Sequence, residues 1–175
     1  MKTRLAYLGA ATATAAALMV VTALPASAAQ TGDTAVTFSL GGGTLDIAVP
    51  TSAALTNGVS GATSITGTLG ATTVTDNRGL LTGWTSSAAS TAFISTPAGT
   101  TSTVVTYGSG TITKTGFVTT TSSGSVPVTT TAVPVVVATL VQGVNTATWN
   151  PTLTVTLPAT STTGAYAGTV TTSVA

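Results

Sequence analysis

The sequence predicts an all-β protein that folds as an antiparallel β-sandwich, with an Ig-like or a jelly-roll-like arrangement of strands. Three observations favour this class. Short segments of alternating apolar and polar residues recur along the chain, glycine and proline separate them, and helix-favouring residues are scarce, since the sequence has no glutamate. The 175 residues show no fixed repeat, so one domain with a sizeable core is expected rather than a solenoid.

Residues 1–28 are expected to be a cleaved secretory signal peptide. Lys2 and Arg4 form a positive start, residues 5–24 are apolar and rich in alanine, and the small residues at 26–28 form a cleavage site. The alternative is a retained membrane anchor, because the apolar run approaches the length of a spanning helix. After cleavage, residues 29–175 form a secreted, extracellular domain with no membrane span.

The first part of the mature chain predicts a series of strands. Alternation at 35–40 and again at 45–50, with three glycines between, predicts a tight hairpin. The glycines lack the following lysine and helix of a phosphate-binding loop. Further strands are expected at 65–69 and 71–75.

The threonine-rich middle, residues 91–131, allows two interpretations. Segments such as 102–107 and 111–118 are rich in strand-favouring residues, and β-branched threonine suits a pleated surface that is partly exposed to solvent, so we expect strands here. The alternative is a disordered, mucin-like stalk.

Three strand-forming segments follow in the last third of the chain. Residues 133–141 form the most apolar mature segment, which is typical of a buried central strand, and 142–145 are expected to turn the chain. A clean alternating strand follows at 153–158. Residues 164–166 and 170–174 then predict a final hairpin.

The central stretch, residues 73–87 (TVTDNRGLLTGWTSS), combines a tryptophan with an ion-pair candidate in a chain of almost no charge. Asp76, Arg78 and Gly79 predict a hydrogen-bonded turn, with a ligand-binding clamp as the alternative. Trp84 is expected to pack in the core or, alternatively, to present a ligand platform, and Trp149 to pack near a strand end.

This stretch resembles the WxL domain of Gram-positive surface proteins. The resemblance is carried by V-x-D-x-R-G at residues 74–79, by Gly83-Trp84, and by G-x-Y ending at Tyr166 before the last strand. Serine, threonine and valine stand at positions 86, 172 and 174, where the family has leucine, tryptophan and leucine. The resemblance implies a secreted β-sandwich held non-covalently on the cell wall, with peptidoglycan as the usual ligand.

The resemblance also selects candidate ligand-binding residues. They are Trp84, Asp76, Arg78 and, by its motif alone, Tyr166, for which the alternative is a packing role. The tail from 160 to 175 holds no apolar span and no sorting sequence, so attachment to the wall is expected to be non-covalent.

The charged residues argue against several function classes. Arg78 and Lys114 stand against Asp33, Asp46 and Asp76 after residue 28, which leaves one net negative charge. A nucleic-acid interface needs clustered cations, so no nucleic-acid partner is expected.

The residue inventory also argues against catalysis and metal binding. The chain has neither histidine nor cysteine, so no disulfide and no thiolate metal site is possible. A glycosidase with paired carboxylates would use Asp46 and Asp76, and neither stands in a recognisable catalytic context. The aspartates lack the spacing of a calcium loop, and no enzyme activity, metal or cofactor is expected.

Two function classes remain. The first is a wall-associated binding module whose partner is peptidoglycan, another wall polymer or another surface protein. The second is a structural subunit that assembles through its sheet edges into a fibre or layer, since low charge and edge strands poor in lysine favour self-association.

Overall fold

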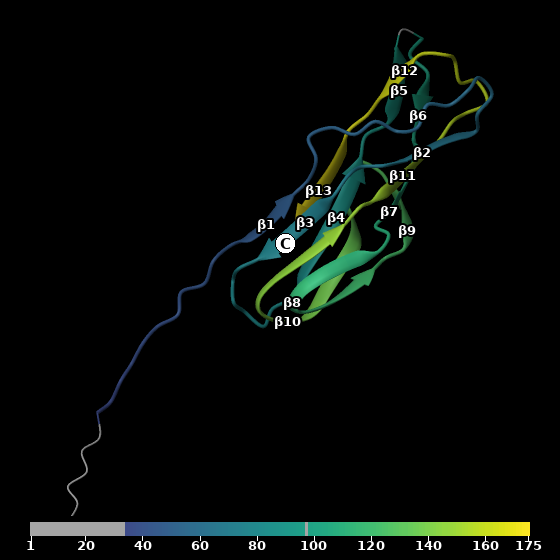
Figure 1. Ribbon diagram of the computed structural model, residues 1–175. Coiled ribbons are helices and arrows are strands. Elements are labelled where there is room, and N and C mark those ends of the chain that lie inside the picture. The colour runs from purple at the N-terminus through teal and green to yellow at the C-terminus, as the bar shows by residue number, and fades with distance from the viewer. Residues whose placement is uncertain (1–33, 97) are drawn as a thin grey trace, which may run out of the picture. The chain divides into compact units, whose positions relative to one another are not determined.

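The computed structural model describes residues 34–96 and 98–175, and the predicted signal peptide lies outside them. The chain divides into two units, residues 1–38 and residues 39–175. All thirteen regular elements of the described residues are β-strands, and they lie in the second unit (Figure 1). No helix in the part of the chain that the structure describes is long and apolar enough to cross a membrane.

The strands form three antiparallel sheets. The largest contains β1 (Leu45–Ala48), β3 (Thr72–Asp76), β10 (Val133–Trp149), β4 (Trp84–Ser90) and β13 (Val170–Val174), with β8 (Ile112–Ser122) also paired to β10. The second contains β2 (Ser64–Thr68), β11 (Thr152–Thr156), β7 (Val104–Gly108) and β9 (Ser125–Val128). The third is small, with β12 (Ala165–Ala167), β5 (Phe93–Thr96) and β6 (Thr101–Ser102). The prediction of an all-β antiparallel sandwich is therefore confirmed.

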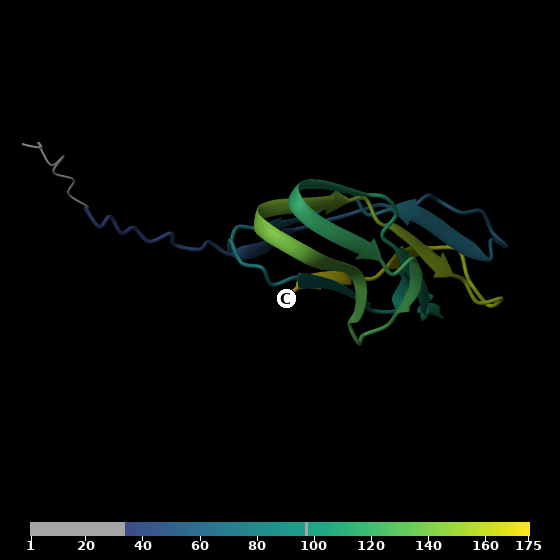
Figure 2. The same cartoon turned by 90° about the horizontal axis from the view of Figure 1, so that it is seen from below.

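The long strand β10 organises the largest sheet. Its first half pairs with β4 and its second half pairs with β3, while β8 runs along its other edge. The strands β3 and β4 therefore follow one another along the same edge of β10, and the loop of residues 77–83 joins them. Opposite this loop the pairing of β10 with β8 shifts register, and the two strands curve together (Figure 2).

Two core clusters lie along this frame. One gathers side chains from both halves of β10 with β3, β4 and β8, and it includes Trp84 and Trp149. The other packs β4 and the start of β10 against β7, β9 and β11 of the second sheet, around Tyr107 and Leu153. Trp149 donates its indole N–H to the hydroxyl of Tyr107 at 3.0 Å and so links the two sheets within the core.

The threonine-rich middle folds as strands. Residues 93–128 contain β5 to β9, and the threonine side chains of β8 at 113, 115, 119 and 121 are exposed. The threonine-rich segment therefore forms an exposed strand surface, as expected, and not a disordered stalk.

Four local expectations are wrong. Residues 35–40 form no strand, and the three glycines make no hairpin but lead into β1, where Gly43 donates its amide to the carbonyl of Asn77 at 2.8 Å. Residues 142–145 do not end a strand, because β10 runs through them. The expected final hairpin is absent as well, because β12 pairs with β5 and β13 pairs with β4.

Candidate functional site

The sequence-predicted pair of Asp76 and Arg78 forms a closed ionic turn at the end of β3. The guanidinium donates from Nε and Nη2 to the two carboxylate oxygens, each at 3.0 Å, and the amide of Arg78 donates to Oδ1 at 3.0 Å. Nη2 also donates to the carbonyls of Thr82 and Gly83, at 3.3 and 3.2 Å. One arginine thus ties both ends of the 77–83 loop together.

The carboxylate of Asp76 is buried, with 1% of the side chain exposed, whereas Arg78 is 21% exposed. Hydrogen bonding from Arg78 lowers the pKa of Asp76 below its ordinary value and outweighs burial, which acts to raise it; Asn145, opposite Asp76 on β10, also lowers it. The carboxylate is therefore ionised at neutral pH and is occupied by the protein's own donors.

Trp84 begins β4 directly after this loop, and its side chain lies in the core with 2% exposed. Its indole N–H and the hydroxyl of Ser86, two residues on, are both buried without a hydrogen-bond partner among the described residues. In this conformation the ring packs inside the sheet and offers no face to a ligand. Asp76, Arg78 and Trp84 thus lie together at this end of the domain. Asp76 and Arg78 close the 77–83 loop, and Trp84 packs in the core beside it.

The same end of the domain carries a strained residue. Leu140 on β10 has a φ of 49°, the left-handed region that leucine rarely adopts, and its side chain is 70% exposed. It lies in the register shift of β10, beside the 77–83 loop. A Cβ on Gly83 would clash with the carbonyl of Ala138, so at Gly83 the loop lies directly against the backbone of β10.

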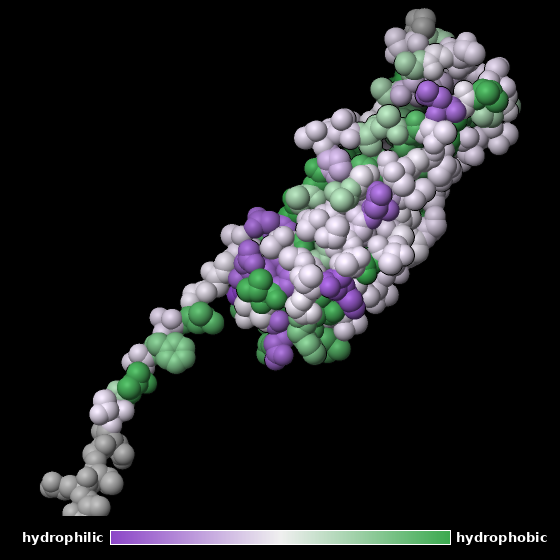
Figure 3. Space-filling model, viewed as in Figure 1, coloured by the Kyte–Doolittle hydropathy of each residue, from purple (hydrophilic) through white to green (hydrophobic). Residues whose placement is uncertain are grey.

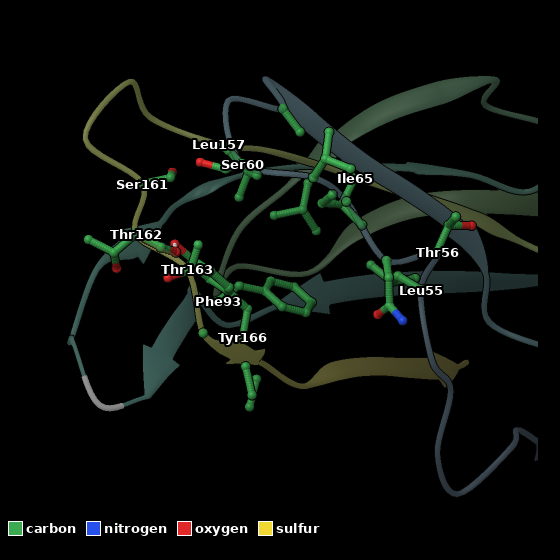
Figure 4. A pocket seen from close by; sticks show the side chains of 18 of the residues that line it. Leu55, Thr56, Ser60, Ile65, Phe93, Leu157, Ser161, Thr162, Thr163 and Tyr166 are labelled. Atoms are coloured by element: carbon green, nitrogen blue, oxygen red, sulfur yellow. Dashed lines mark hydrogen bonds between the residues drawn. The ribbon is translucent and has the colours of Figure 1, made fainter.

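Tyr166 lies elsewhere, on β12, at the end of the sandwich opposite the 77–83 loop (Figures 1 and 2). There it borders a pocket of about 650 Å³. Two segments, residues 53–62 and residues 161–168, form much of its wall. The rest comes from Ile65 of β2, Phe93 of β5, Val155 of β11 and Leu157, which follows β11. In the close view, Phe93 and Tyr166 lie on one side of the space, and Ile65 and Leu157 lie on the other (Figure 4).

The pocket combines aromatic and aliphatic surface with hydroxyl groups, and its lining holds no lysine, arginine or carboxylate. The phenol of Tyr166 donates to the carbonyl of Thr162 at 3.0 Å, which fixes the direction of the ring. Burial acts to raise the pKa of Tyr166, but hydrogen bonding to Ser161, Ser95 and Thr162 outweighs it, so the pKa lies below its ordinary value. The pocket can therefore offer ring faces and hydrogen bonds, and no ionic contact.

Sequence reasoning found Tyr166 but missed the rest of this pocket. Phe93 lies in the threonine-rich middle, Leu157 in the strand predicted at 153–158, and Leu55 in no predicted element. None of these positions indicates a pocket, because the lining comes from four separate segments. Within residues 34–96 and 98–175, the structure gathers no three aspartate, glutamate, histidine or cysteine side chains that would hold a metal ion.

No known protein family, no curated protein and no solved structure matches the chain.

Proposed function

We propose that the chain is a secreted, non-catalytic cell-surface module that associates non-covalently with the cell wall, and that the pocket beside Tyr166 binds the glycan strands of peptidoglycan. The observation that carries the proposal is the pocket itself, which is open and is lined by aromatic rings and hydroxyl groups, with no charged side chain. Its volume of about 650 Å³ lies within the ~300–1,000 Å³ range of small-molecule sites.

The chemistry of the lining favours sugar over anionic wall polymers. A polymer of phosphate groups needs arginine or lysine, or a row of backbone amides at a helix start, and the lining provides neither kind of group. A sugar chain presents hydroxyl groups and apolar C–H faces, which suit the hydroxyls of the 161–163 segment and the rings of Phe93 and Tyr166.

The motif residues shared with WxL domains take a supporting part in this proposal. Asp76, Arg78 and Trp84 hold the far end of the sandwich, so the resemblance at these positions concerns the fold, whereas the resemblance at Tyr166 concerns the ligand. Peptidoglycan binding and cell-wall location therefore stand on the pocket together with the predicted signal peptide.

A pull-down with purified Gram-positive peptidoglycan tests the proposal. We expect the secreted protein to sediment with peptidoglycan and a Tyr166→Ala variant to stay largely in the supernatant, because the variant loses one aromatic wall of the pocket. Phe117→Ala is the matched control, since Phe117 is an aromatic residue of β8 that is 61% exposed and lies outside the pocket. Circular dichroism checks that each variant is folded.

A Tyr166→Phe variant separates the ring from the hydroxyl. Retained binding is expected if the ring face makes the contact. Equal binding by wild type, Tyr166→Ala and Phe117→Ala would show that the pocket is not the glycan site, and absence of wild-type binding would contradict the proposal as a whole.

Self-association is a second candidate function, and a different observation favours it. Val36, Phe38 and Leu40 alternate along a segment before β1 and are 81%, 92% and 92% exposed. Three large apolar side chains in water at strand spacing are typical of a segment that pairs with a partner.

A further inference from the structure

The N-terminal arm, residues 34–40, has the sequence of a strand without forming one. Its apolar side chains Val36, Phe38 and Leu40 alternate with Thr37 and Ser39, which would place the three on one face of an extended chain. All residues of the arm are exposed, and it pairs with no strand of the described residues. The arm is followed by three glycines, and Gly43 is anchored to Asn77.

The strand β8 offers the longest free edge in the domain. It is eleven residues long, and within the described residues it pairs with β10 alone. Residues 119–122 pair regularly with Val136 to Thr139 of β10, and residues 112–115 pair regularly with Thr146 to Trp149. The register shifts lie between these two parts, on either side of the pair formed by Phe117 and Gln142. Residues 117–122 of this edge carry no charged side chain, and an unpaired, uncharged edge is a template for another strand.

An apolar surface lies beside this edge. Phe117, Leu140 and Val144 are 61%, 70% and 62% exposed, and they come from the facing stretches of β8 and β10 where the two strands bend. A Cβ on Gly116 would lie 2.5 Å from the carbonyl of Val144, so the stretch before Phe117 touches the strand that carries Val144. Figure 3 shows hydrophobic residues interspersed with hydrophilic ones at this end of the domain.

We propose that the arm of one copy of this chain adds as a strand to the edge of β8, at residues 117–122, in a second copy. Its side chains Val36, Phe38 and Leu40 then cover the exposed Phe117 and its neighbours. This inference rests on the second candidate function, self-association, and is independent of glycan binding at the pocket. It identifies a donor surface and an acceptor surface on the same chain.

The charge distribution favours a second copy as the occupant. The described residues carry four charged side chains, and Asp76 neutralises Arg78 directly. Neither the arm nor residues 117–122 contain a charge, so neither surface repels its own kind. Lys114, the lysine of β8, stands on its first part, before the proposed acceptor segment.

The geometry predicts a head-to-tail contact. Donor and acceptor are different surfaces, so a copy that donates its arm keeps its own β8 edge open for a third copy. Contacts of this kind extend into open chains unless the rotation between copies closes a ring.

Sedimentation velocity over a concentration series tests the proposal on the secreted protein with an intact arm. We expect the mean mass of the wild type to rise with concentration through the dimer and higher multiples. A donor variant with Val36→Asn, Phe38→Asn and Leu40→Asn is expected to stay monomeric. Its control places the same three asparagines on the other face, as Ala35→Asn, Thr37→Asn and Ser39→Asn, and is expected to associate like the wild type.

An acceptor variant carries Thr119→Lys and Thr121→Lys on exposed positions of β8, and is expected to stay monomeric as well. Ser64→Lys with Thr68→Lys adds the same charge at exposed positions of β2, the edge strand of the second sheet, and is expected to associate normally. Mixing donor and acceptor variants gives the sharpest test. Each retains one intact surface, so the mixture should form a one-to-one dimer and nothing larger.

Three outcomes would overturn the proposal. A wild type that stays monomeric at every concentration is the first, and a donor variant that associates like its control is the second. The third is a monomer whose β8 amides are protected from hydrogen exchange only when the arm is intact, which would show that the arm covers the edge of its own chain. Peptidoglycan pull-down of the same variants is expected to be unchanged, so failure here is distinguishable from failure of the glycan proposal.

Discussion

Replacing Arg78 with alanine is expected to destabilise the domain severely, because it leaves the carboxylate of Asp76 buried without its partner. Asp76 is 1% exposed, and Arg78 supplies three of its hydrogen bonds. Removing one member of a buried ion pair costs about 3–5 kcal/mol. Protonation of the carboxyl limits the cost at pH 7 to roughly 4 kcal/mol, since each unit of pKa is worth about 1.4 kcal/mol. We therefore expect a loss of about 3–4 kcal/mol in the free energy of unfolding.

The reverse substitution, Asp76→Asn, is expected to cost less, about 1–2 kcal/mol, because Arg78 is partly exposed and can turn to water, and asparagine still accepts the amide of the turn. Asp46→Asn is the matched control at an exposed position and should fall within about 0.5 kcal/mol of the wild type. Urea unfolding followed by circular dichroism measures all three. A cost for Arg78→Ala no larger than that for Asp46→Asn would refute the buried-pair reasoning.

The dependence on pH provides an independent check of the same pair. The pKa of Asp76 is lower in the folded protein than its ordinary value, so its stabilisation is present above about pH 4 and is lost as the pH falls through the folded pKa. In Arg78→Ala, burial without a partner raises the pKa instead, and the cost grows as the pH rises. The difference in stability between wild type and Arg78→Ala should therefore shrink on acidification, and a constant difference from pH 3 to 7 would argue against the assignment.

Three further substitutions test the core and the loop. Tyr107→Phe removes the acceptor of the Trp149 indole N–H and should cost about 1–3 kcal/mol in urea unfolding, because a buried donor is left unpaired; no measurable cost would mean that the link between the sheets contributes nothing. Gly83→Ala drives a Cβ into the carbonyl of Ala138 and should cost about 3 kcal/mol in the free energy of unfolding. Its control, Gly79→Ala, places a side chain at φ 68° in open space and should cost only about 1–2 kcal/mol. A lower melting temperature for Gly79→Ala than for Gly83→Ala would contradict the backbone contact.

Local chemistry predicted the elements that depend on neighbouring residues. The turn at Asp76 and Arg78 joins groups two residues apart, so the sequence alone was sufficient to predict it. The strand patterns at 45–50, 65–69, 71–75 and 153–158 likewise predicted β1, β2, β3 and β11 in place. The same kind of pattern also predicted a strand at 35–40, where alternation was present but a partner strand within the described residues was not.

Pairing between distant segments could not be read from the sequence. Gly143 adopts a φ of 68°, as the predicted turn at 142–145 requires, but the chain uses this conformation for a register shift inside β10. Because β8 pairs with both halves of β10, the segment stays within one strand and does not end it in a turn. The strands β12 and β13 are separated by two residues and join different sheets for the same reason.

For the candidate site too, a local motif predicted some residues, and the contacts between distant segments were not predicted. The motif that resembles WxL domains led to Asp76, Arg78 and Trp84, which the structure places in a turn and a core, and to Tyr166, which it places at a pocket. The partners of Tyr166 in that pocket come from segments 53–62 and 161–168 and from Phe93, and no local pattern connects them.

A chemical-shift titration of the isotopically labelled protein, residues 29–175, with soluble peptidoglycan fragments tests the central claim most directly. Glycan binding at the pocket predicts that amide signals of residues 53–62, of Phe93 and of residues 161–168 shift together and saturate, while those of the 77–83 loop stay in place. Shifts confined to the loop or to β8, or no shifts at all in a folded protein, would contradict the account.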